Sequence, residues 1–230
     1  MKKIIWAAVI IFFLAVGYWL IREYTKPLPG EAVADMGRQH VTDIFGVNYN
    51  SNPPTSGSHF AVWAKSGVYD RFISDGYLLH SMEHGYIIIW YDCDRLNTGS
   101  IVKQIYAHDE PAKESTDSGE LFTTESQASL MHMKATPQGD MSWFTPENSP
   151  EVEIELPESF KSDACKALVT GLAEFTKMAQ RVIVVPRLNM DTQIALTAWG
   201  RVDKLDSVDK ERIEAFIKAY HNRGPEQTVE

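Results

Sequence analysis

The longest apolar run in the chain lies at its N-terminus. Residues 4–21 are apolar without interruption, with Lys2 and Lys3 before them and Arg22 directly after. About 18 helical residues span roughly 27 Å, which nearly matches the hydrocarbon core of a bilayer. The two leading lysines favour the cytoplasmic side for residues 1–3. The pattern therefore predicts a single-pass transmembrane anchor, with the rest of the chain outside the cytoplasm.

A cleaved signal peptide is the alternative interpretation of this run. Signal peptides usually have an apolar segment of about 7–15 residues that ends in small residues. This run is longer and ends in Gly17-Tyr18-Trp19-Leu20. We therefore expect an uncleaved signal anchor in the inner membrane, a stalk over residues 22–39, and an extracytoplasmic domain over residues 40–226.

Beyond the stalk, turn-rich and apolar stretches alternate. Residues 48–59 are rich in Asn, Ser, Pro and Gly and predict an ordered loop. A continuous apolar run predicts a buried strand at residues 86–91. Residues 181–185 predict a second buried strand, and residues 194–202 a third strand. Capping residues and helical spacing predict three helices, at residues 75–84, 165–178 and 207–220.

This order of elements predicts an α+β fold, a compact α/β sandwich with a small mixed sheet. A crossover between the first two strands would make them parallel. Residues 95–160 are polar and irregular, and we expect them to form an insertion at the rim of the sheet. The 230 residues leave enough chain after the anchor for one domain.

Charge and cysteine content narrow the function classes. The formal net charge is -9, and no stretch gathers Lys and Arg, so nucleic acid is not an expected partner. The only two cysteines, Cys93 and Cys165, predict one disulfide, because an even pair in an exported domain is typical of a bridge. Two unrelated buried thiols are the alternative.

The sharpest chemical motif is His80-Ser81-Met82-Glu83-His84. On a helix, positions i and i+4 share one face, so His80 and His84 could hold one metal ion. The motif has the form H-x-x-E-H, which occurs in zinc proteases with the glutamate as general base. A zinc-dependent hydrolase with Glu83 as its base is therefore one hypothesis, although Gly85 would end the helix directly after the motif.

Two other interpretations use the same residues. His59, from the ordered loop, could be a third ligand beside His80 and His84, and three imidazoles suit copper or zinc. Alternatively, the histidines only bond backbone groups, and the domain is a structural or partner-binding module of the cell envelope without metal. No motif identifies a protein partner.

Several longer motifs resemble the bacterial family called domain of unknown function 3105. They are NSNPPTSGSH at residues 50–59, WAKSGVY at 63–69, LHSMEHGY at 79–86, MDT at 190–192, AWGR at 198–201, FIKAYH at 216–221 and GPE at 224–226. The resemblance covers most of residues 40–226 apart from the long segment between Cys93 and Cys165. It implies a singly anchored, exported domain and assigns no activity, and it places His59, His80, Glu83, His84, Trp199 and His221 in one shared pattern.

The combined prediction is an envelope domain that binds one copper or zinc ion and is not primarily an enzyme. The expected metal ligands are His59, His80 and His84, with His221 and Met190 as additions. Copper is the first expectation and zinc the second. The hydrolase and the metal-free module remain the alternatives.

Overall fold

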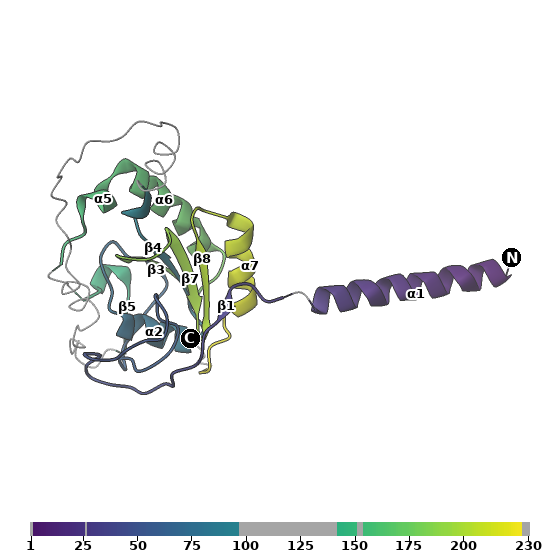
Figure 1. The fold of residues 1–230 in the computed structure, drawn as a ribbon, viewed down its shortest axis with the longest axis horizontal. Coiled ribbons are helices and arrows are strands. Elements are labelled where there is room, and N and C mark those ends of the chain that lie inside the picture. Colours follow the sequence, from purple (N-terminus) through teal and green to yellow (C-terminus); the bar gives the residue numbers. More distant parts are fainter. Residues whose placement is uncertain (1, 26, 97–141, 151–153, 227–230) are drawn as a thin grey trace, which may run out of the picture.

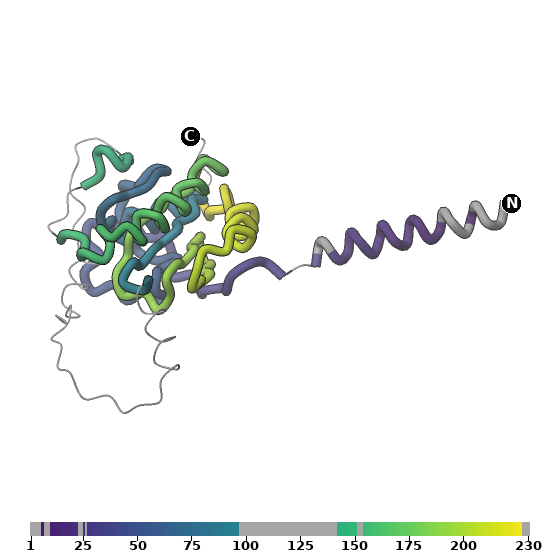
Figure 2. Tube along the Cα trace, turned by 90° about the horizontal axis from the view of Figure 1, so that it is seen from above, coloured from purple at the N-terminus to yellow at the C-terminus, as the bar shows by residue number. Residues whose placement is uncertain are grey.

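The computed structural model of the chain describes residues 2–25, 27–96, 142–150 and 154–226. The first helix, α1 (Lys2–Tyr24), covers the apolar run and stands clear of the domain in both Figure 1 and Figure 2. Among the helices of the described residues, none is both long enough and apolar enough to cross a membrane. The second half of the predicted stalk takes part in the domain, because β1 (Glu31–Ala32) is an edge strand of the main sheet and pairs with β8 (Arg201–Leu205).

A six-stranded mixed sheet forms the centre of the domain, as the sequence predicts in outline. Its order is β1-β8-β7-β4-β6-β3. The central strands β4 (Ile87–Tyr91) and β6 (Val182–Pro186) are parallel, which confirms the predicted pairing. Strand β3 (Gly67–Val68) continues the parallel side, and β7 (Ile194–Ala198) runs antiparallel to β4.

The predicted strand over residues 194–202 is wrong in its extent, because the chain reverses within it. Strands β7 and β8 (Arg201–Leu205) form a hairpin joined by Trp199 and Gly200. Gly200 has a φ of 68°, a left-handed conformation that glycine adopts readily and that a type II turn requires at its second central position. The turn-forming residue was therefore visible in the sequence, inside an otherwise apolar run.

Side chains of alternating direction divide the core into two clusters. Ile87, Ile89 and Tyr91 of β4 face one cluster, whereas Ile88 and Trp90 face the other. Helices α6 (Asp163–Ala173) and α7 (Lys210–Tyr220) pack in the first cluster, and α2 (Asp75–Glu83) packs in the second. The sheet thus lies between helices on both faces, and the sandwich prediction is confirmed.

Short elements complete the domain. The second sheet consists of β2 (Trp63–Ala64) and β5 (Trp143–Phe144), which are parallel. The 3-10 helices are η1 (Pro146–Asn148) and η2 (Glu174–Lys177), and α5 (Glu158–Lys161) precedes α6. The predicted insertion at residues 95–160 lies largely outside the described residues, but β5 shows that its end takes part in the fold.

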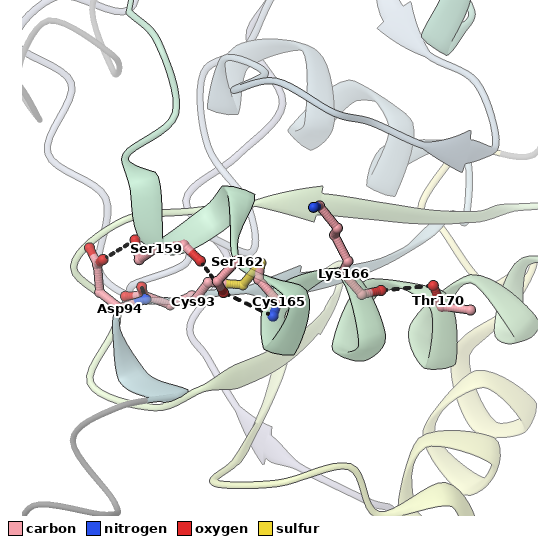
Figure 3. The surroundings of a disulfide bond; sticks show 8 residues. Cys93, Asp94, Ser159, Ser162, Cys165, Lys166 and Thr170 are labelled. Carbon is pink, nitrogen blue, oxygen red and sulfur yellow. Dashed lines mark hydrogen bonds between the residues drawn. A yellow bond between two sulfur atoms is a disulfide. The ribbon is translucent and has the colours of Figure 1, made fainter.

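The predicted disulfide between Cys93 and Cys165 is present. It connects Cys93, two residues after the end of β4, to Cys165 in the first turn of α6, with Cα atoms 5.6 Å apart (Figure 3). The Ser162 hydroxyl caps α6 by accepting a hydrogen bond from the Cys165 backbone N–H at 3.2 Å. The bridge closes a separation of 72 residues and therefore fixes both ends of the segment between the cysteines.

Candidate metal centre

Helix α2 carries the motif, and the sequence explains where the helix begins and ends. The Ser74 hydroxyl caps its start by accepting from the Gly76 N–H, and Gly85, with a φ of 82°, follows its last turn. The helix is buried along its whole length. The Ser81 hydroxyl both donates to the Ala64 carbonyl at 2.7 Å and accepts from the Ala64 N–H at 3.1 Å. These bonds fix the rotation of α2 and so the direction of its histidines.

His80 is buried and has one ring nitrogen left for a ligand. Its Nδ1 lies 2.6 Å from the Phe60 carbonyl oxygen, which can only accept, so Nδ1 carries the proton. The lone pair is therefore on Nε2. Burial is the main cause that lowers the pKa of His80, to about 3, against the opposing effect of the Phe60 carbonyl. The ring is consequently neutral at neutral pH, the form that binds metals.

His59 is fully buried and is oriented in the same way. Its Nδ1 donates to the Gly57 carbonyl at 2.8 Å, which directs Nε2 toward Glu83. Nε2 and the Glu83 Oε2 atom are 2.8 Å apart. Burial lowers the pKa of His59, although the Gly57 carbonyl and the Glu83 carboxylate act in the opposite direction. A backbone carbonyl on one ring nitrogen with the other directed inward is common among metal-binding histidines.

The third histidine, His40, was not predicted from the sequence. Residues 37–41 run beside residues 57–59, with backbone bonds from Gly57 N to Gly37 O, His59 N to Gln39 O and Val41 N to His59 O at 2.8–3.1 Å. His40 thus lies next to His59, and its side chain is 49 % exposed. The segment has no helical or strand periodicity that would have placed this histidine in advance.

His40, His59 and His80 form one cluster from three segments of the chain. One potential ligand atom of each lies within 4.8 Å of those of the other two. The ring centroids are 5.0 Å apart for His40 and His59, 4.8 Å for His40 and His80, and 5.1 Å for His59 and His80. Nitrogen ligands of a tetrahedral ion with bonds of 2.0–2.1 Å lie about 3.3 Å apart. The cluster would therefore contract on binding, and the exposed His40 is the side chain with room to move.

Glu83 adds a carboxylate to this cluster. It is buried, with Oε2 2.8 Å from His59 Nε2 and 3.8 Å from His40 Nε2, and its Oε1 lies 3.7 Å from Arg38 Nε. At 2.8 Å the contact between Glu83 Oε2 and His59 Nε2 is a hydrogen bond, so an ion that enters the cluster would have to replace the proton between these two atoms. Glu83 is thus in the place that either a ligand or a base needs.

The other predicted ligands lie outside this cluster. The ring of His84 is 4.6 Å from that of His80 and 4.8 Å from that of Trp63, and its carbonyl accepts from Arg181. His84 is nevertheless not part of the three-histidine group. Because α2 ends at Glu83, the motif does not continue on a helix as the protease pattern requires. The geometry therefore favours ligands from three segments over the i,i+4 pair.

His221 and Met190 lie in other surroundings. His221 follows α7 and lines a groove of about 430 Å³ together with Met178, Glu214 and Lys218. Burial and the nearby Arg181 lower the pKa of His221. Met190 is fully buried in the core cluster on the α2 face of the sheet. Trp199 does border the site, with its ring 6.0 Å from that of His59 and its indole N–H donating to Asp35.

Comparison with known proteins gives a family without an assigned activity. The family model described as "Protein of unknown function (DUF3105)" matches residues 40–114 and 159–230. No curated protein and no solved structure matches the chain.

Proposed function

Because the chain belongs to the DUF3105 family, whose description names no activity, we propose from the site itself that the domain binds one transition metal ion, copper or zinc. His40, His59 and His80 would be the ligands, with Glu83 beside them. The observation that carries this proposal is the convergence of three imidazoles. Two of them, His59 and His80, each donate a hydrogen bond from Nδ1 to a backbone carbonyl oxygen. Imidazole nitrogens suit both copper and zinc.

The proposal is tested by titrating the full-length chain, in a mild detergent, with copper and with zinc. His59→Gln is expected to lower the affinity at least about tenfold, because it removes one of the three imidazole nitrogens of the cluster. His221→Gln is the matched control, since it removes an imidazole outside the cluster. Equal affinities of the wild-type chain and the His59→Gln variant would contradict the proposal.

We also propose that residues 4–21 anchor the chain in the inner membrane and that the domain lies outside the cytoplasm. The apolar run, the preceding Lys2 and Lys3, and the disulfide support this placement, because disulfides persist mainly in oxidising compartments. The expected result is that protease added to intact spheroplasts degrades the domain and that alkaline washing leaves the chain with the membranes. Protection from protease until the membrane is opened would contradict the orientation.

A further inference from the structure

Arg38 is the cation that faces the candidate metal centre. Its Nε lies 3.7 Å from Glu83 Oε1, and it precedes His40 by two residues. A second contact positions its guanidinium, because Nη1 donates to the Pro225 carbonyl at 3.5 Å. Its side chain is 49 % exposed, so it reaches the buried carboxylate from the surface.

Arg38 changes the charge that a bound ion would meet. The three imidazoles are neutral as ligands, and the only carboxylate in contact with His59 within the described chain is that of Glu83. The positive charge of Arg38 offsets the negative charge of Glu83, so these groups together contribute no net negative charge. The cost of burying an ion grows with the square of its charge, and the repulsion from Arg38 doubles from a monovalent to a divalent ion.

Resting on the proposed function, we infer that Arg38 is a specificity-determining residue that shifts the affinities of this site toward a monovalent soft cation, Cu(I), and away from divalent ions such as Zn(II). The three imidazoles do not decide between the two metals, because imidazole suits both, and the charge of the Glu83 carboxylate, which would favour the divalent ion, is offset by Arg38. The charge of the ion does distinguish Cu(I) from Zn(II), because Arg38 repels the divalent ion more strongly. For a fixed charge near the surface of a protein, the expected contribution to the ratio of affinities is on the order of tenfold.

The inference is tested on the full-length chain in a mild detergent at low salt, under anaerobic conditions. Dissociation constants for Cu(I) and Zn(II) are measured by competition with chromophoric chelators, for the wild type and for Arg38→Gln. We expect the substitution to lower the preference for Cu(I) over Zn(II) on the order of tenfold, because the fixed positive charge is lost.

Two matched variants separate charge from structure. Arg38→Lys keeps the charge and should keep the preference, whereas a purely structural guanidinium contact would be lost in it. Arg71→Gln removes an equal charge that is paired with Asp70 at 3.0 Å outside the cluster, and should leave both constants unchanged. An Arg38→Gln variant whose two affinities change by the same factor would overturn the inference while leaving metal binding itself intact. Absence of metal binding in the wild type would instead contradict the proposed function, and the inference with it.

Discussion

At the residue scale, the three histidines differ in how firmly the protein holds them. His59 and His80 are buried, and each is fixed by a bond from Nδ1 to a carbonyl oxygen, that of Gly57 or Phe60. His40 is half-exposed and belongs to an irregular segment. In the proposed site, His59 and His80 would be oriented before an ion arrives, and His40 would move to complete the site.

This difference predicts distinct effects of two alanine substitutions. His80→Ala should destabilise the metal-free domain by about 1–3 kcal/mol, because it leaves a cavity and an unbonded carbonyl in the core. His40→Ala should change the stability of the metal-free domain by less than about 0.5 kcal/mol but still weaken metal binding. Urea unfolding in the presence of chelator measures the first effect and metal titration the second. A large loss of metal-free stability in His40→Ala would contradict this assignment.

Asp92, which is not one of the three clustered histidines or their neighbour Glu83, makes the free energy of unfolding depend on pH. Burial raises its pKa from 3.8 to about 6, against the opposing hydrogen bonds from the Met190 and Asp94 backbone N–H groups. The folded-state value is above the unfolded one, so the contribution of Asp92 to stability is fully present below pH 3.8 and is lost as the pH rises through about 6.

The Asp92→Asn variant, which cannot titrate at this position, isolates the contribution of Asp92 to the pH dependence of stability. The free energy of unfolding of the wild type, relative to the variant, should decline between about pH 4 and pH 6 and stay level above that range. Unfolding curves at a series of pH values provide the difference. A difference that is constant with pH would show that Asp92 has an ordinary pKa in the folded chain.

At the scale of elements, the end of α2 depends on the segment that follows α7. The Glu83 carbonyl accepts from the Glu226 N–H at 3.0 Å, and the Gly85 carbonyl accepts from the Asn222 N–H at 2.9 Å. Gly224 packs so closely here that a Cβ atom would overlap the backbone carbonyl oxygen of Glu83 and the backbone nitrogen of Gly85. The C-terminal segment therefore supports the turn that carries Glu83.

Gly224→Ala tests this support against a matched control. Because the new methyl group would meet backbone atoms, the substitution should destabilise the domain by about 1–3 kcal/mol and weaken metal binding. Gly171→Ala, on α6 with open space around its Cβ position, should be neutral or stabilise the domain by up to about 1 kcal/mol. Equal free energies of unfolding for the two variants would show that the segment after α7 shifts to accommodate the methyl group without loss of stability.

Local patterns account for most of the elements but for only part of the site. The apolar runs of β4 and β6 and the capped helices α2 and α7 follow from periodicity and capping, which are local signals. His59 and His80 were found through their motifs. His40 joins them only because residues 37–41 run beside residues 57–59, and such backbone pairing between irregular segments leaves no periodic trace in the sequence.

At the scale of the whole molecule, the disulfide connects the sheet to α6 across the long intervening segment. Its separation of 72 residues gives a stabilisation of about 4 kcal/mol in the chain-entropy model. The Cys93→Ser/Cys165→Ser variant should therefore unfold at a distinctly lower urea concentration than the wild type. Dithiothreitol should lower the midpoint of the wild type and leave that of the variant unchanged. Coincident curves for the oxidised wild type and the variant would contradict this role.

For the chain as a whole, the proposal that matters most is metal binding by the three-histidine cluster. The most direct test is elemental analysis of the full-length chain, purified without chelator, beside the His80→Gln and His84→Gln variants. These substitutions remove two histidines of the same motif, of which only His80 belongs to the cluster. We expect about one copper or zinc ion per wild-type chain, its loss in His80→Gln and its retention in His84→Gln. Metal content that is unaffected by His80→Gln would contradict it.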